Sequence, residues 1–256
     1  MIPVGDSVHS RTFPIVNVTI IGLNILIFLY ELTLSTTPLR PSGFSELDVF
    51  FFRWGAIPAC LGDHFGFHPD VSQRELTFYC TNNRAVASVF YSMFLHGGWL
   101  HLFGNMIFLW VFGDNVEDAM GHLRYALFYL IVGLAATATQ VFINQNDFTP
   151  AIGASGAIAG VLGAYLVLYP RARVTALIPF IFFIPFFLPA VVLIGVWFAM
   201  QLISGVAALT TTDVNAGGGI AFFAHIGGFA AGVMLVKVFV VGRTVPPSGY
   251  HRYLRH

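Results

Sequence analysis

Charged side chains are scarce in this chain of 256 residues. Asp, Glu, Lys and Arg together make up 9% of the chain, whereas 57% of its residues are hydrophobic. A soluble domain carries about 25% charged residues, so this composition excludes a soluble globular protein and indicates an integral membrane protein. The 12 basic and 12 acidic residues balance to a formal net charge of zero, which argues against nucleic acid as a partner.

Long apolar runs take the place of the missing charge. A window of about 20 apolar residues is long enough to cross a bilayer as a helix. Six such windows occur along the chain, at residues 14–34, 99–116, 123–143, 155–169, 189–209 and 220–241. The sequence therefore predicts an all-α polytopic membrane protein, a single domain with six transmembrane helices.

The segments outside these runs differ in length and character. Residues 35–95 form a long first loop with amphipathic stretches, which we expect to be a structured external loop packed on the helices. Three prolines between positions 179 and 189 interrupt the apolar stretch before the fifth helix, so residues 174–188 are assigned to an interfacial segment. Residues 242–256 are expected to form a polar cytoplasmic tail.

Basic residues set the predicted orientation, because short cytoplasmic loops of membrane proteins carry an excess of Lys and Arg. The short loops 144–150 and 210–219 contain neither residue type. The opposite ends of the helices carry Arg11, Arg124, Arg171, Arg173, Lys237, Arg243, Arg252 and Arg255. Both termini are therefore predicted to be cytoplasmic, and the short termini favour a prokaryotic inner (plasma) membrane.

Polar side chains inside apolar helices are costly, so each is a candidate functional residue. They gather at the starts of three helices that cross in the same direction: His96, His101 and Asn105 at the second helix, Ser155 on the fourth and His225 on the sixth. All of them are expected at one depth, toward the outer side. The fourth helix is only about 22 Å long, so its start is expected below the outer surface, beside a wet cavity.

Glycine pairs on the fourth and sixth helices favour close helix packing. The pairs are Gly156 with Gly160 and Gly228 with Gly232, each spaced by four residues. Such pairs let two backbones approach closely. If the two helices pack through them, the serine and the histidine at their outer ends come within hydrogen-bonding reach, as a nucleophile and its general base require.

A serine nucleophile also needs donors for the oxyanion that develops in the transition state. The N–H groups at the helix start at Ser155 and the side chains of His101 and Asn105 are candidate donors. Gly153 leaves the backbone beside the serine open. No Asp or Glu lies in a predicted span at the depth of His225, so the pattern predicts a Ser–His dyad.

Three motifs, "HGGWLHLFGNM", "GASGAIAG" and "AHIGGFAAG", follow one another on alternate helices. Together they resemble the rhomboid intramembrane serine proteases, which cleave transmembrane helices of other membrane proteins without a metal or cofactor. The resemblance implies that Ser155 is the nucleophile and His225 the general base. It also implies that His101, Asn105 and the Ser155 amide form the oxyanion hole. Further matching motif positions are His96, Gly153 and Gly156.

The resemblance extends to the fifth helix and then departs at one position. "WFAMQ", from Trp197 to Gln201, looks like the fifth helix of the family, which borders the side where substrate enters, and "TTTDVNAGGG" looks like the cap over the site. Some members carry a tyrosine four residues after the serine, stacked on the histidine, but this chain has Ala159 there. Either another ring supports the histidine or its imidazole is held less firmly, and Phe222 and Phe223 are near it in sequence.

Two other classes of membrane protein are alternatives to a protease. A transporter would favour carboxylates in the spans or paired broken helices in two halves, and neither pattern is evident. An inactive rhomboid-like module that binds membrane clients would be expected to lose the serine or the histidine, whereas this chain keeps both. The expected partners are transmembrane protein substrates and membrane lipid.

The chain has only two cysteines, Cys60 and Cys80, and both lie in the long first loop. A disulfide between them is possible if that side of the membrane is oxidising. His64 and His68 lie between the cysteines and could instead contribute to a metal site. Neither alternative involves the predicted catalytic residues, for which no metal or cofactor is expected.

Overall fold

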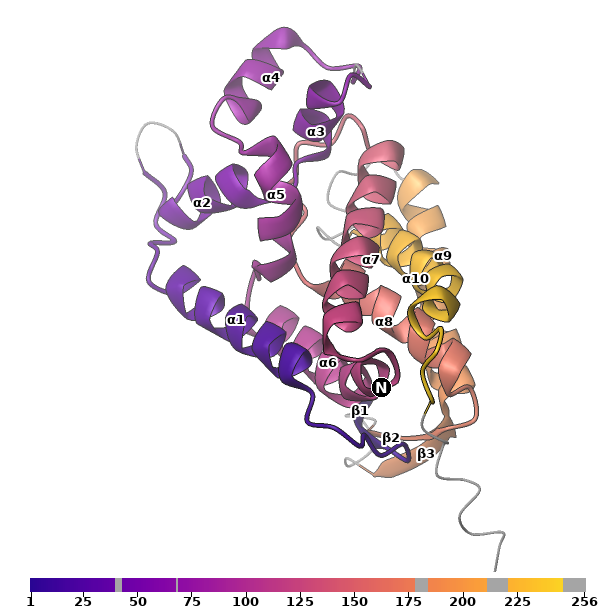
Figure 1. The fold of residues 1–256 in the computed structure, drawn as a ribbon. Coiled ribbons are helices and arrows are strands. Elements are labelled where there is room, and N and C mark those ends of the chain that lie inside the picture. Colours follow the sequence, from indigo (N-terminus) through magenta and orange to yellow (C-terminus); the bar gives the residue numbers. More distant parts are fainter. Residues whose placement is uncertain (40–42, 68, 178–183, 211–220, 246–256) are drawn as a thin grey trace, which may run out of the picture.

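Helices α6, α7, α8 and α10 pack around one apolar core, with α1 and α9 on its flanks (Figure 1). The computed structural model describes residues 1–39, 43–67, 69–177, 184–210 and 221–245. The elements are β1 (Ile2–Asp6), α1 (Ile15–Glu31), α2 (Glu46–Trp54), α3 (Pro58–His64), α4 (Gln73–Cys80), α5 (Ala85–Tyr91), the 3₁₀ turn η1 (Ser92–Phe94), α6 (Trp99–Met120), α7 (His122–Ile143), α8 (Ser155–Leu168), β2 (Arg173–Leu177), β3 (Pro185–Pro189), α9 (Ala190–Thr210) and α10 (Phe222–Phe239).

Helix α8 is the centre of the molecule. Every residue from Gly156 to Tyr165 is buried, although the helix is only 14 residues long. It packs against α6, α7, α9 and α10. A helix that is apolar on all sides must be covered on all sides, and here the covering elements are other helices. The two ends of α8 are therefore enclosed by protein, and polar side chains gather at each of them.

The membrane-spanning character is clear for three helices. In the described part of the chain, α7, α10 and residues Ala190–Ala208 of α9 are long and apolar enough to cross a bilayer, while α1 and α8 are shorter apolar helices. Helix α6 runs to Met120, four residues beyond the predicted end of the second span at 116. The acidic residues of the extra turn are buried and have hydrogen-bond partners: Asp118 accepts from the Arg11 side chain, and Glu117 accepts from the backbone N–H of Asn17 in α1.

Four short helices, α2 to α5, build the long first loop and stand together at one end of the molecule (Figure 1). Ser45 caps α2 in a reciprocal pair of hydrogen bonds with Asp48, and Ser72 caps α4 in the same way with Glu75. Cys60 and Cys80 form a disulfide that joins α3 to α4. His68, a member of the alternative metal pair, lies outside the described residues.

A three-stranded antiparallel sheet at the opposite end corrects the all-α prediction. Strand β2 lies between β1 and β3, with Ile2 opposite Leu177 and Val174 opposite Leu188. The predicted interfacial segment 174–188 therefore contains two strands, and residues 178–183 between them lie outside the described residues. The all-α prediction missed this sheet: β2 pairs on one side with β3, close by in the sequence, and on the other with β1, about 170 residues away, which no local window contains.

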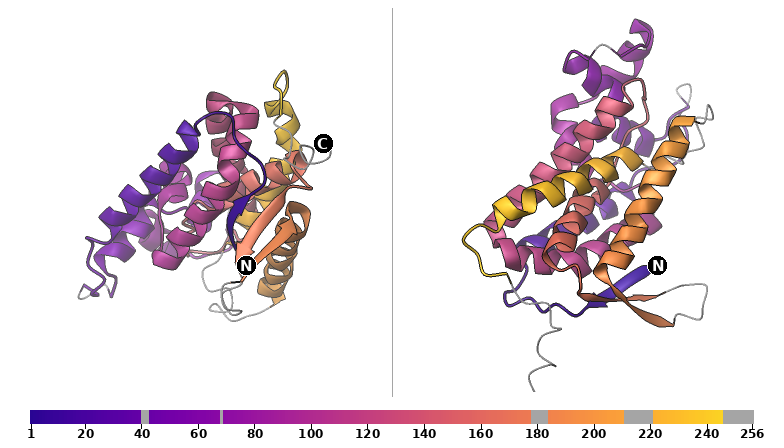
Figure 2. Two further views of the ribbon diagram at one scale, coloured as in Figure 1. Left: turned by 90° about the horizontal axis from the view of Figure 1, so that it is seen from below. Right: turned by 90° about the vertical axis from the view of Figure 1, so that its right-hand side faces the viewer.

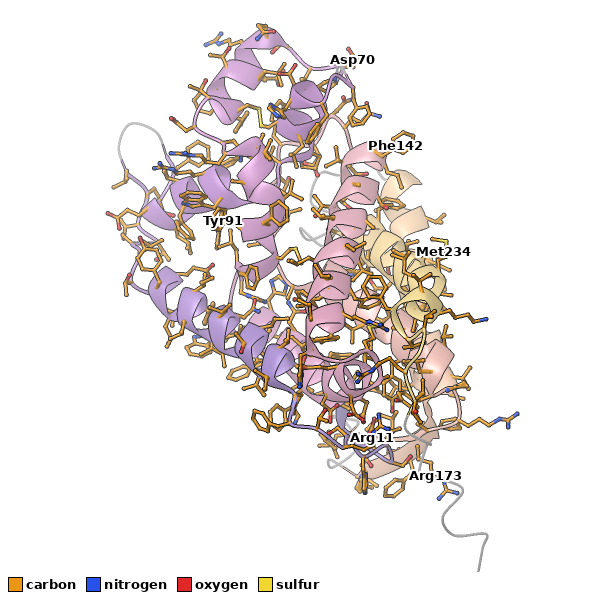
Figure 3. The ribbon with its side chains drawn as sticks, viewed as in Figure 1. Arg11, Asp70, Tyr91, Phe142, Arg173 and Met234 are labelled. Atoms are coloured by element: carbon orange, nitrogen blue, oxygen red, sulfur yellow. A yellow bond between two sulfur atoms is a disulfide. The ribbon has the colours of Figure 1, made fainter. Side chains whose placement is uncertain are left out.

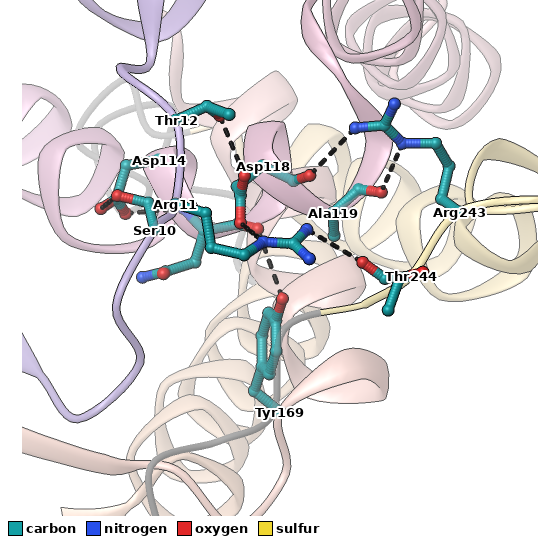
Figure 4. Close-up of polar contacts among 10 residues, drawn as sticks. Ser10, Arg11, Thr12, Asp114, Asp118, Ala119, Tyr169, Arg243 and Thr244 are labelled. Atoms are coloured by element: carbon teal, nitrogen blue, oxygen red, sulfur yellow. Dashed lines mark hydrogen bonds and ion pairs between the residues drawn. The ribbon is translucent and has the colours of Figure 1, made fainter.

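The sheet end also holds a cluster of ion pairs and hydrogen bonds (Figure 4). The guanidinium of Arg11 pairs with the carboxylate of Asp118 at 2.9 Å, and the Thr12 hydroxyl donates to the other oxygen of that carboxylate at 2.9 Å. Arg243 donates to the backbone carbonyl groups of Asp118 and Ala119. These contacts fasten the N-terminal segment and the segment after α10 to the end of α6.

A second acidic residue of α6 secures the start of α1. The Glu117 carboxylate accepts hydrogen bonds from the backbone N–H groups of Val16 and Asn17 and contacts His122 Nδ1 at 2.5 Å. Those N–H groups lie in the first turn of α1, where a helix has no partners of its own. Arg124, near the start of α7, donates to the backbone carbonyl groups of Phe239, the last residue of α10, and of Val241 just after it.

Candidate active site

Ser155 and His225 meet at the end of α8 that is farthest from the sheet. Ser155 is the first residue of α8 and is half-buried, and His225 lies in the first turn of α10 and is buried. The Oγ atom of Ser155 and the Nε2 atom of His225 are 2.8 Å apart, which is a hydrogen bond between residues 70 positions apart in the chain. A serine hydroxyl and a neutral imidazole nitrogen at this distance can exchange a proton.

Glycines bring these two helices together. A Cβ atom at Gly228 would lie 2.0 Å from the carbonyl oxygen of Gly156, and one at Gly232 would lie 2.0 Å from the carbonyl oxygen of Gly160. Real Cβ atoms do not approach an oxygen so closely, so each contact requires a glycine on α10. The backbones of α8 and α10 touch along one face, and this contact places the starts of the helices side by side (Figure 2).

The second ring nitrogen of His225 faces α9. Its Nδ1 atom is 2.8 Å from the side-chain Oε1 atom of Gln201. The ring of Trp197, one helical turn earlier on α9, lies with its centroid 5.9 Å from that of His225. Among the described residues, the aromatic ring recorded beside His225 is therefore Trp197, not the Phe222 or Phe223 considered from the sequence.

Sequence reasoning placed Trp197 and Gln201 at the substrate gate and did not foresee their contacts with His225. A signal was available in the spacing: the two residues are four positions apart and so share one face of a helix. Gln201 is also a strongly polar side chain in an otherwise apolar helix, and such a residue needs a buried partner. Their role as a gate stays a prediction.

His96, His101 and Asn105 form a second group, at the start of α6. The Asn105 side-chain amide Nδ2 lies 2.9 Å from His96 Nε2, and His96 Nδ1 lies 3.3 Å from the carbonyl oxygen of Phe94. These contacts fit a His96 ring that donates from Nδ1 and accepts at Nε2. Within the described part of the chain, the second N–H of the Asn105 amide is left unused. The His101 ring packs edge-on against the His96 ring at 5.0 Å.

Gly153 connects this group to the serine. Its φ angle is +120°, a conformation that side chains disfavour, and a Cβ atom there would lie 2.6 Å from His101 Nε2 and 3.6 Å from Asn105 Nδ2. The chain therefore passes directly in front of both side-chain nitrogens two residues before Ser155. Glycine at this position keeps the donors close to the start of α8.

Glu31 holds the segment that leads into α6. Its carboxylate lies at the end of α1, is 2% exposed, and accepts the backbone N–H of His96 with both oxygens at 3.2 Å. Its position fixes the turn from which the His96, His101 and Asn105 side chains project.

A small cavity of about 30 Å³ lies beside Ser155. Gly153, Thr137 and Gln140 contribute to its walls, and the Gln140 side chain accepts a hydrogen bond from the backbone N–H of Ala224 at 3.2 Å. A volume of at least about 10–15 Å³ with polar partners is enough to hold a water molecule. The cavity is therefore large enough to hold one water molecule beside the serine.

No cluster of three or more potential metal-ligating side chains occurs among residues 1–39, 43–67, 69–177, 184–210 and 221–245. The segment "TTTDVNAGGG", likened to a cap, falls almost wholly at residues 211–220, outside the described part of the chain, as does the tail from residue 246 onward. The groups that the structure brings together are thus a serine, three histidines and the amide side chains of Asn105, Gln140 and Gln201. They define a helical membrane protein with a serine–histidine pair at the buried start of its central helix.

Comparison with known proteins places this molecule in a family. The Rhomboid domain matches residues 83–242, which include the serine, the histidines and the amide side chains described above. The chain therefore belongs to the rhomboid family, and the resemblance drawn from its motifs is confirmed.

Curated relatives come from plants, fungi and animals. RHOMBOID-like protein 6, mitochondrial, of Arabidopsis thaliana is 28% identical over 63% of this chain and 45% of its own length. Rhomboid protein 1, mitochondrial, of Saccharomyces cerevisiae is 28% identical over 57% of this chain and 40% of its own length. The human presenilin-associated rhomboid-like protein, mitochondrial, is 27% identical over 64% and 42%. The chain spans less than half the length of each of these relatives.

Proposed function

We propose that this protein is an intramembrane serine endopeptidase that hydrolyses peptide bonds in or near transmembrane helices of other membrane proteins. The observation that carries the proposal is the 2.8 Å contact between Ser155 Oγ and His225 Nε2 at the start of α8. Family membership supports it. A structural role alone would not require a buried imidazole with one nitrogen on a serine and the other on an amide.

In the proposed reaction, His225 Nε2 takes the proton of the Ser155 hydroxyl as the Oγ atom attacks the carbonyl carbon of the scissile peptide bond. The carbonyl oxygen becomes an oxyanion. The proposed donors to it are the Ser155 backbone N–H, the unused N–H of the Asn105 amide and His101, which the turn at Gly153 keeps close to the serine.

The reaction then passes through an acyl-enzyme. His225 returns its proton to the leaving amine, the carbon–nitrogen bond breaks, and the substrate remains as an ester on Ser155. Water from the cavity beside the serine gives up a proton to His225 and attacks this ester. Ser155 leaves with a proton, which restores the starting state without a metal or cofactor.

The proposal includes the arrangement in the membrane. We place α1, α6, α7, α8, α9 and α10 as six membrane helices, with the sheet at the cytoplasmic surface and the catalytic group toward the outer side. Arg11 and Arg173 lie at the sheet end of the molecule, as cytoplasmic basic residues would, and Asp70 lies at the other end (Figure 3). The proposed location is a plasma membrane of prokaryotic type.

A fluorophosphonate probe tests the proposed nucleophile. We expect the purified protein in detergent to be labelled at Ser155, and labelling to be lost in Ser155→Ala and His225→Ala. Ser10→Ala makes the same substitution at the opposite end of the molecule, where the hydroxyl donates to Asp114, and should label like the wild type. A wild-type protein that does not react would contradict the proposal and favour a catalytically silent, client-binding member of the family.

A further inference from the structure

His225 has a partner that the reaction above does not use. The proposed mechanism needs only its Nε2 atom, yet Nδ1 makes a 2.8 Å contact with the Oε1 atom of Gln201. The histidine is 8% exposed, so few other groups can reach this nitrogen. In the described residues, this amide oxygen is the hydrogen-bond partner recorded for Nδ1.

The contact determines which nitrogen carries the proton. A neutral imidazole has one N–H, which can sit on either nitrogen, and the hydrogen bond at one nitrogen sets the state of the other. An amide oxygen is only an acceptor, so Nδ1 must be the donor. The lone pair is then on Nε2, where the Ser155 hydroxyl is located. The opposite tautomer would point an N–H at the hydroxyl and could not accept its proton.

Aromatic contacts fix the helix that carries this amide. The ring of Phe198 stacks on that of Phe229 with centroids 4.2 Å apart, and Trp197 also approaches Phe229, at 6.4 Å. Phe229 lies on α10, one turn after His225. These rings hold α9 against α10 next to the imidazole. Gln201 follows Trp197 by one turn, so its amide is presented at the level of His225.

We propose that Gln201 is a positioning residue that holds His225 in the Nδ1-protonated tautomer and so makes it competent as the base for Ser155. The inference rests on the proposed function and adds to it. An uncharged amide here fills the place where a carboxylate orients the histidine in other serine hydrolases, and together with Trp197 it compensates for Ala159. Helix α9 thereby carries part of the catalytic apparatus, and a displacement that breaks this contact leaves the base unfixed.

Two substitutions that keep the length of the Gln201 side chain distinguish a positioning role from a packing role. Gln201→Met keeps the length of the side chain and removes the acceptor, whereas Gln201→Glu keeps an acceptor oxygen. Met200→Ala is the control, because this neighbouring side chain on α9 is 60% exposed. The measurements are the rate constant for fluorophosphonate labelling of Ser155, and kcat and KM for a transmembrane substrate in detergent.

We expect Gln201→Met to lower the labelling rate and kcat by about 10- to 100-fold, as loss of an orienting partner does elsewhere, with KM nearly unchanged. Gln201→Glu should recover most of that loss, and Met200→Ala should behave like the wild type. Wild-type rates in Gln201→Met would overturn the inference. Equal losses in Gln201→Met and Gln201→Glu would also overturn it, because the acceptor would then not matter.

A spectroscopic measurement tests the role of Gln201 even if the protein shows no catalytic activity. The ¹⁵N chemical shifts of labelled histidine at alkaline pH distinguish the two neutral tautomers, and His225→Ala assigns the signal. We expect the Nδ1-protonated form in the wild type and a mixture in Gln201→Met. If the tautomer is the same in both, Gln201 does not set it. If the wild type shows the ¹⁵N chemical shifts of the Nδ1-protonated form but no labelling of Ser155, the proposed function fails, whereas the positioning role of Gln201 stands.

Discussion

The two ends of α8 carry polar clusters of opposite character. At the sheet end the groups are carboxylates with fixed donors, such as Asp118 with Arg11 and Asp6 with Tyr165. At the other end they are Ser155, His225 and their neutral neighbours. Both clusters satisfy buried polar groups, which would otherwise be costly. The second pairs a serine hydroxyl with an imidazole nitrogen, as the proposed reaction requires, and is named the chemical cluster. The first joins the N-terminal segment to α6 and is named the structural cluster.

The largest expected effects would separate the two clusters directly. His225→Ala should abolish substrate cleavage while the protein stays folded, because it removes the base. Asp118→Ala should lower the free energy of unfolding by about 1–3 kcal/mol, because Arg11 and Thr12 lose their acceptor, and should leave the turnover of folded molecules close to the wild type. Thermal unfolding and cleavage assays on both variants test this. Retained cleavage in His225→Ala together with lost cleavage in folded Asp118→Ala would contradict the roles given to the two clusters.

A smaller loss of activity is expected when Asn105, a proposed oxyanion donor in the chemical cluster, is replaced. Asn105→Ala removes one proposed oxyanion donor and should lower kcat by about 10- to 1,000-fold. Its effect on KM should be small, since the oxyanion exists only in the transition state. Steady-state kinetics on a transmembrane substrate gives both constants. An unchanged kcat would remove Asn105 from the oxyanion hole.

The contact between α8 and α10 holds the chemical cluster together, and it can be tested with two identical substitutions. Gly228→Ala places a Cβ atom 2.0 Å from the Gly156 carbonyl oxygen, whereas Gly195→Ala on α9 meets nothing within 4 Å. Forced overpacking costs about 1–3 kcal/mol, while glycine to alanine in an open helical position stabilises by up to about 1 kcal/mol. Thermal unfolding in detergent should therefore shift in opposite directions. A decrease of equal size in both variants would contradict the close contact.

The smallest expected effect concerns pH and the structural cluster. Burial raises the pKa of Asp6 to about 7 from an ordinary value of 3.8; the Tyr165 hydroxyl lowers it and the Asp114 carboxylate raises it. Folded protein then binds this proton more tightly than unfolded protein between those two pH values. Its contribution to stability is lost as pH rises through that window.

Thermal unfolding measured across the same pH range checks this expectation. In the wild type, the contribution of Asp6 should make the midpoint fall as pH rises from about 4 to about 7. Asp6→Asn cannot titrate and should lose that part of the slope. Identical slopes in the two proteins would show that Asp6 does not carry the raised pKa.

The sequence contained much of the candidate site because its residues lie in local motifs. Ser155 and His225 each start an apolar helix, and the glycine spacing indicated which faces would meet. Asn105 and His101 share a helix face by simple periodicity. Such patterns are complete within a few turns of one helix, so they can be read without knowing the fold.

The remaining features depend on contacts between distant segments. Strand β1, with the sequence IPVGD, contains a proline and a glycine and reads as a turn until β2 lies beside it. The partnership of Gln201 with His225 depends on the rotation of α9 about its axis, which ring contacts with Phe229 set. The spacing of Trp197 and Gln201 shows that they share a helix face, but in neither case does a local pattern show which distant segment is the partner.

The proposed role of Ser155 as the nucleophile that cleaves transmembrane helices can be tested in a membrane. The experiment follows cleavage of a single-span substrate reconstituted in liposomes with either the wild type or Ser155→Ala. We predict product from the wild type at a defined bond in or near the span, and none from the variant. Equal amounts of the same product from both proteins would contradict the account.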